Sequence, residues 1–164
     1  LRPYFADAYA GLGDASAAKG NVNGAVSAYQ KALVHNPLNP RVYVSLGRIY
    51  YGETERYVEA VTAYKKAVEL DPRYVEARMG LAEVYEDKGL DQDAIGEYRK
   101  VVEQDDKNTG ALYNLALVHE KVDPKEAISL WERYIALAGP LPAEKDWVDV
   151  ARLHLRKLKS QFKD

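Results

Sequence analysis

Large apolar residues recur along this chain at the spacing of one face of an α-helix. Tyr43, Leu46 and Tyr50 follow one another at intervals of three and four residues, and similar runs occur in other parts of the chain. No segment alternates apolar and polar residues with the two-residue period of a β-strand. The pattern therefore predicts an all-α chain of amphipathic helices joined by short turns.

The helical pattern recurs as a unit of two helices, with large, small and turn residues at fixed offsets. Three consecutive copies match closely, and a fourth, looser copy follows them. This arrangement resembles the tetratricopeptide repeat, a helix–turn–helix unit of about 34 residues. The signature residues of the four copies are Leu12, Gly13, Ala25, Tyr29, Ala32 and Pro37; Leu46, Gly47, Ala60, Tyr64, Ala67 and Pro72; Leu81, Ala82, Ala94, Tyr98 and Val101; and Leu115, Ala116, Ala127, Trp131 and Tyr134.

The resemblance covers residues 6 to about 140 and implies a right-handed superhelical solenoid of such repeats. The second copy has one extra residue in the turn between its helices, from Tyr51 to Val58. Local signals mark several helix ends. Asn39-Pro40 and Asp123-Pro124 each place an N-cap side chain before a proline at the first helical position. The repeats are predicted at residues 6–39, 40–74, 75–108 and 109–140.

The two ends of the chain lie outside the four copies. Leu1-Arg2-Pro3 precedes a large-residue position at the same distance as Leu70-Asp71-Pro72. Residues 1–5 are therefore interpreted as the tail of a preceding repeat, and the alternative is an ordinary lead-in segment. Residues 141–164 are predicted to form a C-terminal capping helix with a polar outer face, as repeat arrays require. Its expected packing stripe, in which Trp147 makes a large contact, is Trp147, Val150, Ala151, His154, Leu155, Leu158 and Phe162.

Composition narrows the class of protein. The 23 Lys and Arg residues against 25 Asp and Glu residues exclude a broadly basic nucleic-acid binder, so no nucleic-acid partner is expected. The absence of Cys excludes a disulfide framework, a zinc finger and a cysteine nucleophile. It is compatible with the cytoplasm or with an extracytoplasmic bacterial compartment, so the localisation stays open. No apolar stretch is long enough for a membrane span.

No catalytic site, cofactor or metal is expected from the sequence. His35, His119 and His154 are far apart in the chain and show no metal-ligand spacing. His119 occupies the position that Tyr50 and Tyr85 fill in other copies, which favours a histidine packed in the core. A protein-binding surface is therefore the remaining candidate site.

In tetratricopeptide proteins the first helices of the repeats line a concave groove that receives a peptide, loop or helix of a partner. The resemblance implies the same groove here. Tyr and Arg are common interface anchors, so Arg41, Arg48, Tyr51 and Tyr113 are favoured; the alternative for Tyr51 is packing beside Tyr57. The predicted groove residues are Arg41, Val44, Arg48, Tyr51, Glu76, Met79, Glu83, Tyr113 and Asn114.

The same positions indicate which partners do not fit. Family members that hold the C-terminal tails of chaperones use a clamp of Lys and Asn residues around a carboxylate. Only Asn114 fits that pattern, so no terminal-carboxylate clamp is expected. Residues 75–108 carry five basic against ten acidic residues, which favours a partner with basic or donor groups. The positions that depart from the clamp are Ala10, Asp14, Ser45, Met79 and Glu83.

The leading hypothesis is a non-enzymatic protein–protein interaction scaffold or adaptor, acting as a subunit or assembly factor of a larger complex. One alternative is the recognition or regulatory domain of a longer enzyme whose catalytic part is absent from this sequence. A third hypothesis is binding of a membrane surface or RNA by the basic capping helix. It ranks last because docking on the last repeat explains the apolar stripe better.

Overall fold

A computed structural model describes residues 3–162, and within them the chain folds into nine α-helices with no β-strand. The all-α prediction is confirmed. Leu1 and Arg2, which belong to the predicted tail of a preceding repeat, lie outside the described residues. The helices are α1 (Pro3–Ala18), α2 (Val22–His35), α3 (Pro40–Arg48), α4 (Tyr57–Leu70), α5 (Val75–Asp87), α6 (Asp91–Gln104), α7 (Thr109–Val122), α8 (Pro124–Ala138) and α9 (Lys145–Gln161), with a π-helical turn η1 (Ile49–Glu53) and a 3-10 turn η2 (Pro142–Glu144).

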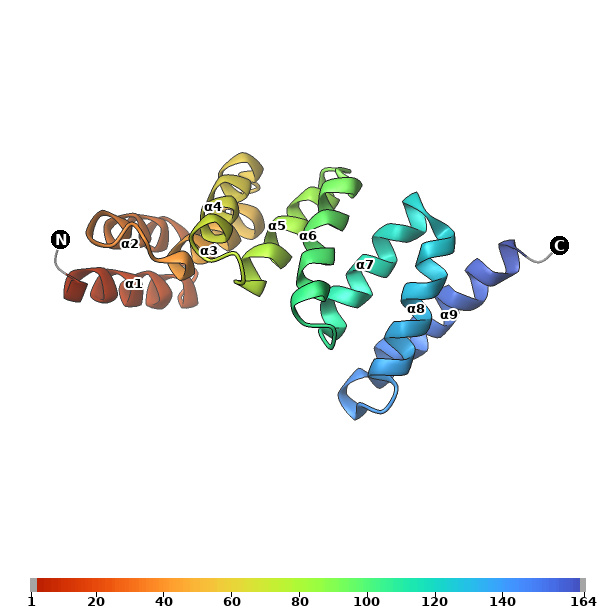
Figure 1. Cartoon of the computed structure of the whole chain (residues 1–164). Helices are drawn as coiled ribbons and strands as arrows, with labels where there is room; N and C mark the ends of the chain where they lie inside the picture. Colours follow the sequence, from red (N-terminus) through yellow and green to blue (C-terminus); the bar gives the residue numbers. More distant parts are fainter. Residues whose placement is uncertain (1–2, 163–164) are drawn as a thin grey trace. The chain divides into compact units, whose positions relative to one another are not determined.

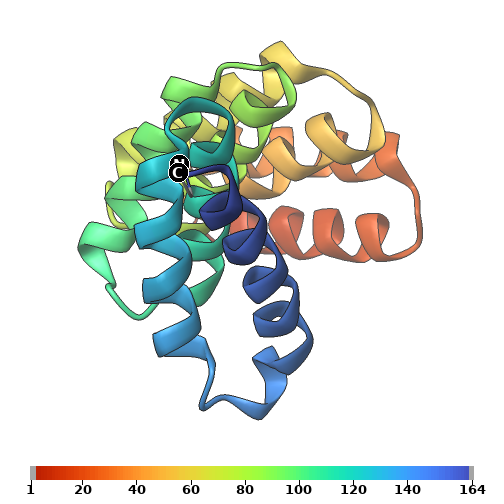
Figure 2. The same ribbon diagram turned by 90° about the vertical axis from the view of Figure 1, so that its right-hand side faces the viewer.

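The chain divides into two compact units, residues 1–84 and residues 85–164, with the boundary inside α5. In the first unit α1 packs on α2 and α3 packs on α4, each pair joined by a short connection (Figure 1). In the second unit α7 packs on α8. The capping helix α9 lies beside α8 in both views (Figures 1 and 2). No helix within residues 3–162 combines the length and the apolar character needed to cross a membrane.

A contact between a glycine and a tyrosine brings the helices of each pair in the first unit close together. The buried ring of Tyr29 lies on Gly13, and the buried ring of Tyr64 lies on Gly47. A β-carbon at Gly47 would be 2.7 Å from the Tyr64 ring, so any larger residue would push the helices apart. Four small core positions predicted from the repeats in this unit, Ala25, Ala32, Ala60 and Ala67, are buried, and Ala28 and Ala63 are buried as well.

The predicted helix-end signals are confirmed. The side chain of Asn39 accepts hydrogen bonds from two backbone N–H groups at the start of α3, and the side chain of Asp123 does the same for α8. Gly20 and Gly89, which end α1 and α5, have φ angles of 72° and 69°. That left-handed conformation favours glycine.

The extra residue of the second copy lies in a π-helical turn. The sequence placed it in a turn from Tyr51 onward, but η1 continues α3 through that region. A π-helix bonds residues five apart and so takes up one residue more than an α-helical turn. The carbonyl of Tyr50 accepts from the backbone N–H of Arg56 at 2.7 Å and from Thr54 Oγ1 at 3.1 Å, and these bonds close the turn.

The capping helix α9 packs through a face that differs from the predicted stripe. Val148, which is not in that stripe, is buried together with Ala151 and Leu158. Trp147, in contrast, is 56% exposed, and Val150 and Phe162 are exposed as well. The expectation that Trp147 is a buried contact of the cap is therefore wrong. Among the predicted stripe residues, only Ala151 and Leu158 are buried. The fully buried tryptophan of this unit is Trp131.

Candidate protein-docking surface

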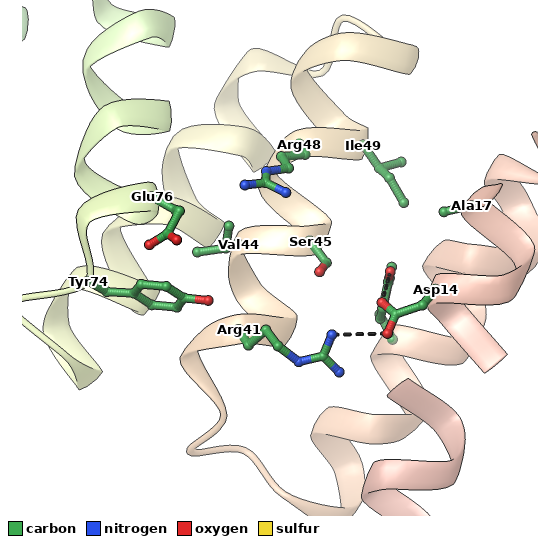
Figure 3. Close-up of a pocket in the computed structure, with 10 residues that line it drawn as sticks. Asp14, Ala17, Arg41, Val44, Ser45, Arg48, Ile49, Tyr74 and Glu76 are labelled. Atoms are coloured by element: carbon green, nitrogen blue, oxygen red, sulfur yellow. Dashed lines mark hydrogen bonds and ion pairs between the residues drawn. The ribbon is translucent and has the colours of Figure 1, made fainter. Parts of the chain in front are cut away.

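Two neighbouring pockets in the first unit contain seven of the nine predicted groove residues. They share Arg48 and Glu76, and we call them together the α3–α5 groove. The first has a cavity volume of about 460 Å³ and is lined by Asp14, Ala17, Tyr29, Arg41, Val44, Ser45, Arg48, Ile49, Tyr74 and Glu76 (Figure 3). The second, of about 370 Å³, is lined by Arg48, Tyr51, Tyr64, Val75, Glu76, Met79, Gly80 and Glu83.

Helix α3 provides the central wall of the groove. Arg41, Val44 and Arg48 lie three and four residues apart, so they share one face of the helix. Val44 is buried at the base of that face, and the two arginine side chains are exposed beyond it (Figure 3). The result is an apolar floor with a guanidinium group at each end.

The two arginines differ in their electrostatic surroundings. Arg41 Nη1 lies 3.0 Å from Asp14 Oδ2, and the Tyr29 hydroxyl donates to Asp14 Oδ1 at 2.7 Å. Partial burial raises the pKa of Asp14, but these hydrogen bonds outweigh it and hold the pKa below its ordinary value. Arg41 is thus neutralised within the first unit. Figure 3 marks no ion pair between Arg48 and the other lining residues, so Arg48 is the cation that this pocket presents.

The second pocket joins Arg48 to acidic and aromatic groups. Burial raises the pKa of Tyr64 to about 12, and the charge of Glu83 acts in the same direction. The Tyr64 side chain is therefore uncharged at physiological pH and forms a neutral wall of the second pocket. Met79 is half-buried beside it. Tyr51 lines this pocket and also packs on Tyr57, with ring centroids 6.0 Å apart. Its position therefore agrees both with a groove residue and with the alternative, packing beside Tyr57.

Tyr113 and Asn114 lie in the second unit and line a separate pocket of about 270 Å³. Tyr113 is half-buried, and its ring contacts those of Trp131, Tyr134 and Trp147 at centroid distances of 5.0, 5.3 and 5.4 Å. It is therefore a packed member of an aromatic cluster as well as a pocket residue. The complete lining is Thr109, Gly110, Tyr113, Asn114, Tyr134, Glu144 and Trp147.

Several lining residues were not among the predicted groove positions. Tyr74 precedes α5, in the turn that joins two repeats, and so occupies no first-helix position. Ile49 follows the last residue of α3 and begins η1. Glu144 lies in η2, for which the repeat pattern offers no template. Repeat position alone could not find any of these three residues.

The histidines form no metal site. Within residues 3–162 no group of three or more His, Cys, Asp or Glu side chains is arranged to hold a metal ion. His119 is buried in the core, as predicted. Burial lowers its pKa below the ordinary value, partly offset by the charge of Glu126. His154 Nδ1 lies 2.7 Å from Glu120 Oε1, an oxygen that also accepts from Trp131 Nε1 at 2.7 Å.

Comparison with known proteins agrees with this architecture. The structure of MamA superposes with a TM-score of 0.77 at 24% identity and covers 98% of this chain and 96% of its own. The structure of YrrB, described as a tetratricopeptide repeat protein with an unusual peptide-binding site, gives 0.73 at 25% identity over 93% of this chain and 74% of its own. Ycf37, an uncharacterised protein of Cyanophora paradoxa, is 36% identical over 81 residues.

The match to ycf37 spans 49% of this chain and 46% of that protein, which is less than half of the relative's length. A family model for the tetratricopeptide repeat matches residues 6–74 and 50–109, more than half of the chain. The resemblance in the repeated residues is thereby confirmed: the chain belongs to the tetratricopeptide repeat family.

Proposed function

We propose that this chain is a non-enzymatic docking module that binds a peptide, loop or helix of a protein partner in the α3–α5 groove. One observation carries the proposal: positions selected by repeat offset line two pockets that share Arg48 and Glu76. Repeat proteins of this kind offer extended surfaces for binding. The peptide-binding site described for YrrB supports the same use of the fold.

The chemistry of the groove favours a particular kind of partner segment. The floor is apolar at Val44 and Met79, and Arg48 stands beside it with Glu76 and Glu83 nearby. An apolar side chain of the partner would fill the floor, and an adjacent carboxylate or amide would pair with Arg48. Hydrogen bonds to a charged guanidinium are among the stronger ones in proteins. A terminal-carboxylate clamp and a nucleic-acid partner are not part of the proposal.

In this role the chain would act as a scaffold or adaptor that holds its partner within a larger complex. Tyr113 and Asn114, in the second unit, would contribute a further contact region. The groove offers a complete set of features for such binding. It combines an apolar floor, a cation that the pocket presents, and a half-buried aromatic residue, Tyr51.

The test begins with capture of the partner from the native source and its identification by mass spectrometry. Its dissociation constant is then measured for the parent chain, Arg48→Ala and Tyr51→Ala. Each substitution is expected to weaken binding by about 1–3 kcal/mol, as for interface anchors. Arg73→Ala is the matched control, because Arg73 is exposed in the turn between α4 and α5 and lines neither pocket.

Equal losses for Arg48→Ala and Arg73→Ala would show a general charge effect and contradict the proposal. So would a complex in which Arg48 and Tyr51 stay in contact with solvent while the partner covers the second helices α2 and α4. Unfolding curves of the variants serve as the fold control. Arg48 is exposed, so the curve of Arg48→Ala is expected to coincide with the parent's. Tyr51 is half-buried and packs on Tyr57, so Tyr51→Ala is expected to show a small loss of stability and to remain folded.

A further inference from the structure

The pocket of the second unit has walls made by two tyrosines of the fourth repeat copy, Tyr113 and Tyr134, and by Trp147, which lies outside the repeats. It lies among the start of α7, the turn η2 and the first turn of α9. Tyr113 and Trp147 meet edge to face, with their planes at 78°, and Tyr134 contacts Tyr113 from α8. Since 56% of Trp147 is exposed, much of its indole surface remains open to an incoming group.

A carboxylate completes this pocket. Glu144 Oε1 accepts a hydrogen bond from Thr109 Oγ1 at 3.0 Å, and Glu144 Oε2 accepts one from the Tyr134 hydroxyl at 2.9 Å. Both donors are neutral, so they fix the carboxylate in place without compensating its charge. Among the described residues no lysine or arginine forms an ion pair with Glu144.

The Tyr134 hydroxyl stays protonated over the physiological pH range, so it remains a hydrogen-bond donor to Glu144. Burial raises the pKa of this phenol well above its ordinary value, and the hydrogen bond to Glu144 raises it further. Tyr134 is itself buried, so its hydroxyl has a fixed direction. The position of the Glu144 carboxylate is therefore set by the core of the unit.

Aromatic faces and a carboxylate attract the same kind of ligand. The face of an indole or phenol ring carries negative potential and attracts cations within about 6 Å of its centre. Each carboxylate oxygen of Glu144 accepts one hydrogen bond here and can accept another. A guanidinium is planar, stacks on aromatic faces and donates to carboxylates through a fixed fork, whereas an ammonium is a strongly hydrated point charge. The guanidinium fits this combination best.

We propose that the pocket formed by Tyr113, Tyr134, Glu144 and Trp147 binds the guanidinium group of an arginine side chain. The group would stack on Trp147 and donate to Glu144. A protein partner is taken as the source of the arginine, and only that choice rests on the proposed function. The pocket lies wholly in the second unit, so it can be tested without a partner and without the α3–α5 groove.

The experiment titrates the full chain with N-acetyl-arginine methylamide and follows the two indole N–H resonances by NMR. The matched probe is N-acetyl-citrulline methylamide, which has nearly the same shape and no charge. The Trp147 resonance is expected to shift saturably with the arginine probe and about tenfold more weakly with citrulline, a loss of about 1.4 kcal/mol. Trp131 contacts Tyr113, so its resonance is not independent of the pocket. The backbone resonance of Gly11, an exposed residue of the first unit, therefore serves as the internal reference.

Two variants locate the binding. Glu144→Gln keeps one acceptor oxygen for the two hydroxyl donors, replaces the other oxygen by an NH2 group and removes the charge. It is expected to weaken binding of the arginine probe about tenfold, a loss of about 1.4 kcal/mol. Glu103→Gln, at an exposed position of α6, removes the same charge outside the pocket and should leave binding unchanged. Trp147→Leu, followed through the backbone resonance of Gly110, should also weaken binding.

An unmoved Trp147 resonance would overturn the proposal, and so would equal shifts with arginine and citrulline. Equal effects of Glu144→Gln and Glu103→Gln would also overturn it. These outcomes leave the Arg48 and Tyr51 experiment untouched. Conversely, a partner that does not contact the α3–α5 groove would contradict the proposed function and leave the result of the arginine titration unchanged. Failure of the proposed function can therefore be distinguished from failure of the arginine-binding proposal.

Discussion

The ring of Tyr64 lies so close to Gly80 that a β-carbon at position 80 would overlap it. The same ring covers Gly47, which places Tyr64 between α3 and α5. Tyr64 and Gly80 both line the second pocket of the α3–α5 groove. The packing of the first unit and the shape of the groove therefore depend on the same contact.

Gly80→Ala is expected to destabilise the chain by about 1–3 kcal/mol, because the methyl group would displace the buried Tyr64 ring. Gly11→Ala is the matched control, since Gly11 is exposed in α1 and a β-carbon there meets no atom within 4 Å. That change should be neutral or stabilising by about 0.5–1 kcal/mol. Urea unfolding measures both. Equal effects of the two substitutions would contradict the role of the Tyr64 contact.

Trp131→Ala is expected to cost about 3–5 kcal/mol, since Trp131 is fully buried in α8. The change also removes the donor that Trp131 Nε1 provides to Glu120. Trp147→Ala should cost clearly less, because more than half of Trp147 is already in water. Thermal unfolding of the two variants gives the comparison. A larger loss for Trp147→Ala would restore the buried-cap interpretation.

The stability of the chain is expected to fall as the pH drops below about 6.5, the ordinary pKa of histidine. The folded pKa of His119 is lowered by burial, so the folded state favours the neutral ring. As the pH falls, His119 is therefore protonated in the unfolded state before it is protonated in the folded state. This stabilises the unfolded state relative to the folded state until the pH passes the pKa of His119 in the folded state. Free energies of unfolding measured from about pH 7 to about pH 5, a range in which an ordinary histidine titrates, test this expectation.

His119→Leu should flatten that pH dependence, because it removes the buried titrating group. His35→Gln is the control, since His35 is only half-buried and stacks on Tyr9 at 5.7 Å. The control variant is expected to keep the slope of the parent chain. If both variants show the parent's slope, His119 does not carry the effect.

Asp123→Ala is expected to destabilise the chain by about 0.5–2 kcal/mol, because it removes the N-cap of α8. The Asp123 side chain accepts from the backbone N–H groups of Lys125 and Glu126, both at 3.2 Å. Asp106→Ala removes an exposed acid from a turn of the same unit and serves as the control. Unfolding in urea that does not separate the two variants would argue against a stabilising cap.

The features that the sequence predicted well depend on local chemistry. The N-caps Asn39 and Asp123 are specified within a few residues, so the structure places them as expected. The burial of His119 followed from its repeat position. The α3 and α5 residues that repeat position selected line two neighbouring pockets, and their role in binding a partner stays a prediction.

The features that the sequence missed depend on packing between segments. An apolar stripe shows that α9 has a packing face but not which edge of the stripe reaches α8, so the exposure of Trp147 was not predicted. Tyr74 and Glu144 reach their pockets from turns, where repeat offsets carry no information. The contacts of Tyr113 with three other rings join residues from three helices, which no spacing within one helix can indicate.

The π-helical turn η1 also bears on how this chain can change in length. Because Ile49–Glu53 absorbs the additional residue within one turn, the Tyr64 ring on Gly47 keeps the arrangement that Tyr29 has on Gly13. Deleting one residue from η1 would allow the turn to relax to ordinary α-helical geometry while the paired helices stay in register. Segment Ile49–Glu53 is thus a position where insertions and deletions between paired helices can be tolerated during divergence.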